Sequence, residues 1–417
     1  KEDASVVPPS IKRFRSMKKN PWLVIIGMDG GGFDKLAQIA KQHITSAEYI
    51  IGPKRHLSML PSCDASLIEL PSPFSKGIEI VLSRRGQPCV MLTSGDPFWF
   101  GAGSNITSKL IPGEWKAIPN HSCFSLCAAE LGWALDQTLC IGLHAAPFSR
   151  LRPYLAPNRK IMATMRDGAS VNELANYLCR IGFGNTQITI LESLGSTNQK
   201  ITKSCASDLE EEFMHPVMVA LDISGDGETI QSSSGIPDSW FKHDGQITKQ
   251  AVRAFTLSSL APRSGEHLWD LGAGSGSIGI EWLLSGPFMR ATAVEKNSER
   301  VNTIKKNALN LGVDQLIVVE SNINDAIYDL EKPDCIFIGG GLNEDLIQLL
   351  WSHIGDGTRV VANGVTIETD RLLTSLQGKF GGRVQRLEIS HLEKIGNMHG
   401  WKASFPITQW VTIKGNY

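Results

Sequence analysis

Short apolar runs alternate with helix-like stretches along the first half of the chain. Apolar runs that end in glycine or a polar residue are typical of buried strands, and apolar positions spaced three or four apart are typical of helices. Strands are predicted at 22–28, 48–52, 89–94, 136–146, 159–165, 186–195 and 214–223. Helices are predicted at 33–47, 124–133 and 170–182. This order indicates an α/β domain.

The pattern stops at residues 224–237, which are rich in Gly and Ser, and then begins again. A helix is predicted at 248–260, and strands are predicted at 266–271, 290–297, 316–323, 333–341, 357–366, 383–394 and 409–415. The last two strands are expected to form an antiparallel end of the sheet. We therefore predict four parts: a flexible arm (1–20), a first α/β domain (21–223), a linker (224–237) and a doubly wound α/β domain (238–417).

Composition narrows the class of protein. The chain has 417 residues with a net charge of −1, so it has no overall basic field to attract nucleic acid. No apolar run approaches the ~20 residues that cross a bilayer. We expect a cytoplasmic protein with no nucleic-acid and no membrane partner.

The cysteine and histidine spacing favours no metal site. Cys123 and Cys127 lie four residues apart, which suits either two buried thiols or half of a metal site, and buried thiols are the favoured interpretation. His391, Glu393 and His399 suggest a metal only loosely, and surface positions explain them equally well. No metal is predicted.

The densest glycine stretch, WDLGAGSGSIGIEW at 269–282, begins in the last residues of a predicted strand. An aspartate and alternating glycines with small residues between them form the loop: Asp270, Gly272, Ala273, Gly274, Ser275 and Gly276. The spacing is neither the GxGxxG of dinucleotide folds nor the GK[ST] of a phosphate loop, so it favours a ligand without phosphate.

Two acidic residues sharpen the choice of ligand. Glu295 ends the next strand and can accept both hydroxyls of a ribose, while Asp270 can take the amine of an amino-acid tail. A ribose joined to an amino acid indicates S-adenosylmethionine. The alternatives are NAD and a tight glycine turn that binds nothing.

The segment FIGGGLNED, at 337–345, bears on the methyl acceptor. Amino methylases of nucleic-acid bases usually carry [ND]PP[YF] at this place, and the chain does not. The glycines 339–341 leave room for a large, flat substrate, so protein and RNA acceptors are disfavoured.

The first half carries two loops of its own. IIGMDGGGFDKL places glycines after the first strand, which is weak evidence alone because many strand–helix turns contain glycine. LTSGDPFWFGAGS ends a strand at Gly95 and Asp96, where α/β folds place ligands. A simple Asp-Pro turn is the alternative.

These loops, with IGLHAAP and MATMRDG, resemble the tetrapyrrole methylase family over residues 21–223. From about Gly235 the chain resembles the decarboxylating precorrin methyltransferases, through HDGQITKQAVRAFTLSSLAP and the late glycine loop. The resemblance implies a bilobal tetrapyrrole-methylase fold followed by a Rossmann-like class I methyltransferase domain. It also implies one S-adenosyl-L-methionine for each domain.

The resemblance assigns cofactor contacts in both domains. Those in the first domain are Gly27, Gly30, Gly95, Asp96, Ser122, His144 and Thr164. Those in the second, besides the glycine loop and Glu295, are Thr248 and Ile323.

The implied reaction is methylation of a precorrin at C5 and C15 with decarboxylation of the C12 acetate (precorrin-6B to precorrin-8X) in aerobic cobalamin biosynthesis. Catalytic candidates are Asp96, His243 and Lys249, although a structural role before its helix is the favoured interpretation of His243. Arg150, Arg152 and Arg159 can anchor substrate carboxylates or simply lie on a solvated loop. We expect a homo-oligomer. The alternatives are an RNA or protein methyltransferase with a regulatory lobe, and a tetrapyrrole carrier without activity.

Overall fold

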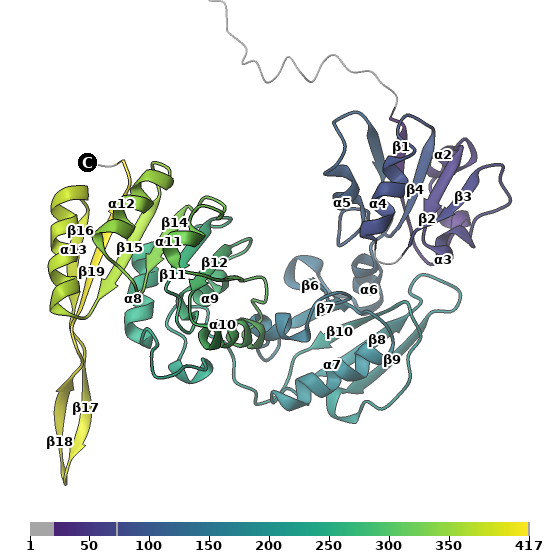
Figure 1. Ribbon diagram of the computed structural model, residues 1–417. Coiled ribbons are helices and arrows are strands. Elements are labelled where there is room, and N and C mark those ends of the chain that lie inside the picture. The colour runs from purple at the N-terminus through teal and green to yellow at the C-terminus, as the bar shows by residue number, and fades with distance from the viewer. Residues whose placement is uncertain (1–20, 72–73, 416–417) are drawn as a thin grey trace, which may run out of the picture. The chain divides into compact units, whose positions relative to one another are not determined.

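The computed structural model describes residues 21–71 and 74–415, so the predicted arm at 1–20 lies outside the described residues. The chain forms two compact units: one holds the residues up to Ala146 and Pro157–Gly227, and the other holds Pro147–Ala156 and the residues from Glu228. Each unit is an α/β structure (Figure 1). Over the described ranges, no helix is both long and apolar enough to cross a membrane.

The first unit contains two five-stranded sheets. The first sheet is parallel throughout, in the order β3-β2-β4-β1-β5. Its strands are β1 (Leu23–Met28), β2 (Tyr49–Gly52), β3 (Ser66–Glu69), β4 (Cys89–Ser94) and β5 (Trp115–Ile118). Its helices are η2 (Phe33–Lys35), α2 (Gln38–Thr45), α3 (Lys54–Leu57), α4 (Ser75–Leu82) and α5 (Gly103–Thr107). All six residues of β1 are buried, as the apolar run predicts for a central parallel strand.

The second sheet of this unit is mixed, in the order β6-β7-β10-β8-β9, and only β6 and β7 are parallel. Its strands are β6 (Leu139–Gly142), β7 (Lys160–Thr164), β8 (Gln187–Glu192), β9 (Lys200–Cys205) and β10 (Val217–Asp222). The accompanying helices are α6 (Cys123–Leu131), η3 (Leu135–Gln137), α7 (Ala169–Arg180) and η5 (Ala206–Asp208). The Ser122 hydroxyl caps α6 by accepting a hydrogen bond from the Ser125 amide, 3.0 Å away.

The second unit is a seven-stranded sheet in the order β13-β12-β11-β14-β15-β19-β16, parallel except for β19. Its strands are β11 (His267–Leu271), β12 (Arg290–Glu295), β13 (Ile317–Glu320), β14 (Cys335–Ile338), β15 (Arg359–Gly364), β16 (Arg383–Leu387) and β19 (Ile407–Ile413). Its helices are η6 (Asp238–Trp240), α8 (Gln250–Leu260), α9 (Ser277–Leu284), α10 (Ser298–Asn310), α11 (Ile323–Ala326), α12 (Glu344–His353) and α13 (Ile367–Phe380). This is the predicted doubly wound arrangement with an antiparallel end.

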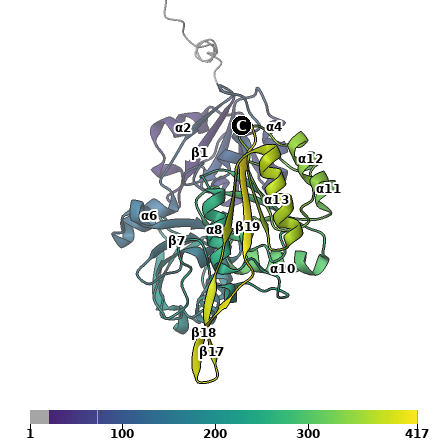
Figure 2. The ribbon, with the colours of Figure 1, turned by 90° about the vertical axis from the view of Figure 1, so that its left-hand side faces the viewer.

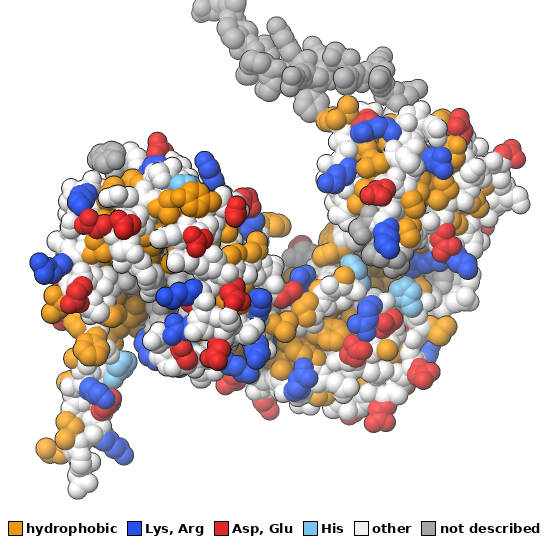
Figure 3. Space-filling model, viewed as in Figure 1, with side chains coloured by type: hydrophobic (Ala, Val, Ile, Leu, Met, Phe, Trp, Pro, Cys, Tyr) orange, Lys and Arg blue, Asp and Glu red, His pale blue; other side chains and the backbone are white. Residues whose placement is uncertain are grey.

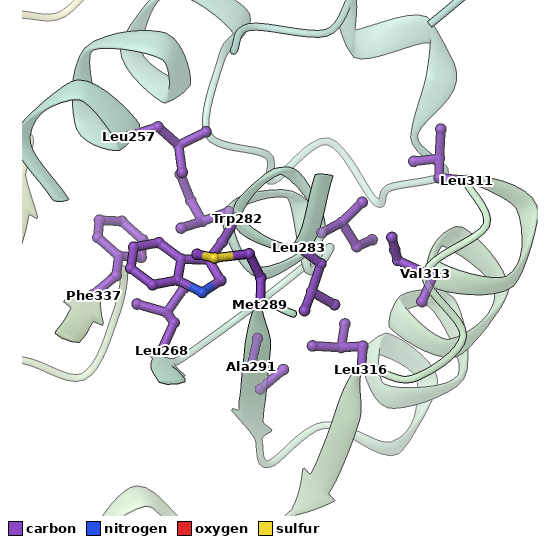
Figure 4. Close-up of a cluster of buried hydrophobic side chains, with 14 of the residues drawn as sticks. Leu257, Leu268, Trp282, Leu283, Met289, Ala291, Leu311, Val313, Leu316 and Phe337 are labelled. Atoms are coloured by element: carbon purple, nitrogen blue, oxygen red, sulfur yellow. The ribbon is translucent and has the colours of Figure 1, made fainter. Parts of the chain in front are cut away.

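Helices cover both faces of this sheet. On one face Trp282 of α9 packs beside Leu257, Leu268 and Phe337 (Figure 4). The Trp282 indole nitrogen donates to the Arg290 carbonyl oxygen at 3.0 Å, so its polar atom is satisfied inside the core. A separate cluster of buried side chains fills the opposite face beneath α12 and α13.

The prediction of one strand at 383–394 is wrong. The chain leaves the sheet after β16, and β17 (Ser390–Ile395) pairs instead with β18 (Met398–Ala403) in a separate antiparallel hairpin. Both views show this hairpin projecting from the second unit (Figures 1 and 2). All six residues of β17 are exposed, so the strand lacks the buried face that would place it in the sheet.

A short segment from the middle of the first half packs with the second unit. The helical turn η4 (Phe148–Tyr154) contacts α10. The Arg150 guanidinium forms a bidentate pair with Asp314, at 2.7 and 3.0 Å. Arg152 is buried and stacks over Trp240, with 4.5 Å from its guanidinium carbon to the ring centroid. The chain therefore leaves the first unit at Ala146, returns at Pro157 and leaves again at Gly227.

Candidate active sites

The second unit has a cavity of about 1250 Å³ at the carboxyl ends of its parallel strands. The strand order turns back between β11 and β14, and open α/β sheets bind ligands at such a switch point. The cavity is lined by predicted residues from four loops: Thr248, Lys249, Gly272, Ala273, Gly274, Ser275, Glu295 and Ile323. The glycines 339–341 after β14 line it too.

The glycine loop and Glu295 are joined directly. The buried Glu295 carboxylate accepts hydrogen bonds at 3.0 Å from the backbone amides of Gly274 and Asn297. Gly274 has φ +59°, a conformation that strongly favours glycine. A carboxylate held by two amides at the rim of the cavity is positioned to accept hydroxyl groups from a ligand.

Asp270 lies beneath the loop instead of facing the cavity. Its Oδ2 accepts a hydrogen bond from the Gly279 amide at 2.9 Å, near the start of α9. Its Oδ1 has no hydrogen-bond partner among the described residues. Burial, supported by the charge of Glu295, raises the pKa of Asp270 to about 7. Asp270 therefore supports the loop from below, and Gly276, which precedes α9, is also absent from the described lining.

A buried arginine that the sequence analysis did not identify fixes the segment before α8. Arg253 forms ion pairs with Glu281, at 2.5 Å, and with Asp238, at 3.1 Å. It also donates to the carbonyl oxygen of Thr248, while Glu281 accepts from the Gly235 amide at 2.6 Å. A buried charge is tolerated when it is paired in this way. The network thus holds residues 235–249 where Thr248 and Lys249 reach the cavity.

The two catalytic candidates of this segment have different positions. Lys249 lines the cavity, with its ammonium nitrogen 3.6 Å from Asp238. His243 is exposed and absent from the described lining, and its Nδ1 accepts a hydrogen bond from the Gly245 amide at 3.0 Å. Its geometry matches the structural alternative for this histidine.

The projecting hairpin supplies one wall of the same cavity. His391, Glu393 and Lys402 line it, and Lys402 pairs with Glu393 at 3.0 Å. His399 is not part of the described lining, and no group of three metal-binding side chains exists within the described ranges. The sequence analysis placed His391 and Glu393 on a strand of the sheet, and the local pattern did not show that this segment forms a hairpin at the cavity.

The first unit has its own cavity of about 680 Å³. It is lined from both sheets of the unit, and the lining contains most of the residues predicted for this domain: Gly30, Gly95, Asp96, Ser122, His144 and Thr164. Gly27 lies just outside, in contact with the loop after β4. A Cβ atom at Gly27 would come within 1.7 Å of the Gly95 carbonyl oxygen, so the end of β1 and the loop after β4 approach closely only because residue 27 is glycine.

The segment after β4, which begins with Gly95 and Asp96, lines part of this cavity. Asp96 lines it and also accepts a hydrogen bond from the Phe98 amide at 2.8 Å. The following Trp99 and Phe100 have ring centroids 5.8 and 5.7 Å from that of Phe124. Phe100 has φ +54°, a strained conformation of the kind that proteins retain at functional sites.

The three predicted anchoring arginines are elsewhere. Arg150 and Arg152 have partners within the second unit, and Arg159 is an exposed residue preceding β7. Among the described residues, none of the three arginines lines either cavity. The positions of Arg150 and Arg152 favour a packing role.

The two halves of the chain match two families of methyltransferase. Residues 23–210 match the tetrapyrrole (corrin/porphyrin) methylases, and residues 239–414 match the precorrin methyltransferase domain. The fold and its two cavities thus define a tandem methyltransferase.

Relatives align along nearly the whole chain. It is 40% identical over 405 residues to a precorrin-6Y C(5,15)-methyltransferase (decarboxylating) of Sinorhizobium sp., covering 95% of this chain and 97% of the relative. A protein of the same name from Mycobacterium tuberculosis is 31% identical, covering 94% and 100%. A probable cobalt-precorrin-6B C(15)-methyltransferase (decarboxylating) from Saccharolobus solfataricus is 36% identical over 154 residues, covering 35% and 77%. The chain belongs to the precorrin-6Y C(5,15)-methyltransferase (decarboxylating) family.

Proposed function

We propose that the chain methylates a precorrin at C5 and C15 and removes carbon dioxide from the C12 acetate, with one methyl-donor site in each unit. The observation that carries this proposal is the presence of two separate cavities, each at the carboxyl ends of parallel strands and each lined by a glycine loop and a carboxylate. Family membership along the full chain supports the choice of substrate.

S-adenosyl-L-methionine, when bound, supplies an electrophilic methyl group. The second unit fits it through the buried, amide-held carboxylate of Glu295, which suits a ribose, and through Ile323 and the Gly272–Ser275 backbone. In the first unit, Gly30 and Gly95 allow close approach of the backbone, and Asp96, Ser122 and Thr164 offer polar atoms at the cavity.

Methylation of an electron-rich ring carbon requires alignment and exclusion of water more than a strong base. The three glycines after β14 keep side chains away from one side of the second cavity, which leaves room for a flat macrocycle. Lys296 offers positive charge for a substrate with many carboxylates, while Lys249 and Lys402 line the cavity already paired with Asp238 and Glu393.

We assign C15 methylation and decarboxylation to the second unit and C5 methylation to the first. The matched 154 residues make up 77% of the relative from Saccharolobus solfataricus. That relative is named for C15 methylation with decarboxylation alone, which supports placing both steps in one unit. In decarboxylation the bond to the carboxyl carbon breaks, its electron pair passes into the ring, and a proton then completes a methyl group at C12.

The test is incubation of the full chain with precorrin-6B and the methyl donor, followed by mass spectrometry. The product gains two methyl groups and loses one carbon dioxide. Asp96→Ala and Glu295→Ala remove different steps, and calorimetry with S-adenosylhomocysteine gives two sites per chain. A single site, or one residue abolishing both methylations, contradicts the division between units.

We further propose that the protein is a cytoplasmic homo-oligomer that associates through the β17–β18 hairpin. Its eight cysteines are free, as is typical of a reducing compartment. Ile395, Met398 and Trp401 are 68%, 73% and 75% exposed. The protruding hairpin carries hydrophobic side chains on the face shown in Figure 3. An isolated two-stranded hairpin is marginally stable in water, so burial against copies of itself would stabilise it.

Sedimentation of Trp401→Glu tests the role of the hairpin. The variant is expected to dissociate into monomers, while Phe288→Glu, which alters an exposed aromatic residue elsewhere in the same unit, retains the wild-type mass. A wild-type monomer would overturn the proposal.

A further inference from the structure

One cation in the cavity of the first unit has no carboxylate partner. Arg55 belongs to α3, directly after β2, and its side chain lines the cavity. Its guanidinium donates to the Ser94 hydroxyl at the end of β4, one residue before Gly95. Among the described residues, no carboxylate lies within ion-pair distance of Arg55.

The other charged groups of this cavity have partners. Arg166 also lines it, but it pairs with Asp167 at 2.8 Å and with Glu173 at 3.1 Å. The two lining carboxylates, Asp29 and Asp96, each accept a backbone amide two residues further along, at 2.8 Å. Arg55 thus differs from Arg166, although both are arginines of the same cavity.

Arg55 is exposed by its accessible surface, yet the protein packed around its guanidinium still disfavours the isolated charge. Partial loss of water around the guanidinium lowers the pKa of Arg55, as is expected when a cation gains no counter-charge. The neighbouring His56 does not add a second cation, because burial, assisted by the charge of Arg55, lowers the pKa of His56 to about 3. An entering carboxylate would therefore find one charged donor to bind.

Apolar side chains line other parts of the same cavity. Met59, Leu70, Trp99 and Phe100 line the same cavity, and Trp99 and Phe100 are 44% and 51% exposed. Flat apolar side chains and one unpaired guanidinium complement a ring system that carries acid side chains at its edge.

We propose that Arg55 binds one carboxylate side chain of the tetrapyrrole in the first unit and so orients the ring for methylation there. This inference rests on the proposed function of that unit. Because Ser94 both holds Arg55 and precedes Gly95, the anchored carboxylate would lie beside the loop proposed to hold the methyl donor.

The test compares Arg55→Gln, Arg55→Lys and the control Lys54→Gln in the full chain. Lys54 is the adjacent cation on α3, exposed and absent from the described lining. Arg55→Gln is expected to raise the KM for C5 methylation roughly 10- to 100-fold, the range for a lost charge-assisted hydrogen bond. Arg55→Lys recovers part of the loss, because it restores charge without the planar fork. C15 methylation and affinity for S-adenosylhomocysteine stay unchanged.

Three outcomes overturn the inference: an Arg55→Gln KM within twofold of wild type, an equal effect in Lys54→Gln, or an equal loss of S-adenosylhomocysteine affinity. Titration of precorrin-6B, followed by its absorbance, measures binding without turnover. If the wild type binds precorrin-6B but methylates nothing at C5, the proposed function of the first unit fails. In that case the titration of Arg55→Gln still decides whether Arg55 binds the tetrapyrrole.

Discussion

The two cavities are built in different ways. In the second unit the glycine loop and Glu295 lie one helix apart in the chain and are joined by a hydrogen bond from the Gly274 amide. In the first unit the lining comes from segments spread between Met28 and Met218, on two sheets. A site within one βαβ unit is visible as a local motif, whereas a site between two sheets exists only after the chain has folded.

The largest expected effect concerns the buried arginine of the second unit. Arg253→Met leaves Glu281 buried without its cation and is expected to destabilise this unit by about 3–5 kcal/mol. Calorimetric melting should show one transition shifting down and the other, from the first unit, unchanged. Arg300→Met, which breaks the exposed pair with Asp244, serves as the control. A uniform shift of both transitions would mean that the units do not unfold separately.

Substitution of Glu295 is expected to affect methylation in the second unit and not in the first. Glu295→Gln retains the shape of the side chain but removes its charge, and we expect a roughly 100-fold loss of C15 methylation, equivalent to about 2.7 kcal/mol. Isotope-labelled methyl transfer, resolved by position, measures both steps in the same sample. Glu320→Gln, at the paired position on the neighbouring strand, is the matched control. Loss of C5 methylation in Glu295→Gln would contradict separate sites.

The raised pKa of Asp270 predicts that the stability of the second unit depends on pH. Its folded pKa of about 7 lies above the ordinary value of 3.8, so the folded state binds more protons between these values. The unfolding free energy of this unit therefore decreases as pH rises from about 4 to 7, and the loss is complete above the folded pKa. Denaturation at pH 5 and pH 8 measures it. Asp270→Asn should reduce the dependence, and an unchanged slope would show that Asp270 is ionised throughout.

The smallest expected effect concerns Arg150. Its pair with Asp314 is partly exposed, so Arg150→Ala is expected to destabilise the second unit by only about 0.2–1 kcal/mol. Methylation assays at low precorrin concentration should give an unchanged KM. An increased KM would instead support the predicted role of Arg150 in binding substrate carboxylates.

The sequence predicted the features that depend on neighbouring residues and missed those that depend on residues far away in the chain. The strands β1 and β11 are mostly apolar segments with a glycine at or just after their carboxyl ends, Gly27 and Gly272, and both were predicted because such segments are usually buried. The hairpin β17–β18 and the docking of residues 147–156 were not predicted. Their positions depend on pairing with distant partners, such as Arg150 with Asp314, and no local pattern encodes such a partner.

The sequence by itself determined two α/β units, the glycine loop at 272–275 and the acid Glu295 that line the second cavity, and the family, because these depend on short-range patterns of apolar, glycine and acidic residues. Only the tertiary structure decided that Asp270 supports the loop from below, that Arg253 fixes the segment before α8, and that Arg55 stands unpaired among the described residues of its cavity. Burial and pairing of a charge are set by residues far away in the chain, and those contacts form only on folding.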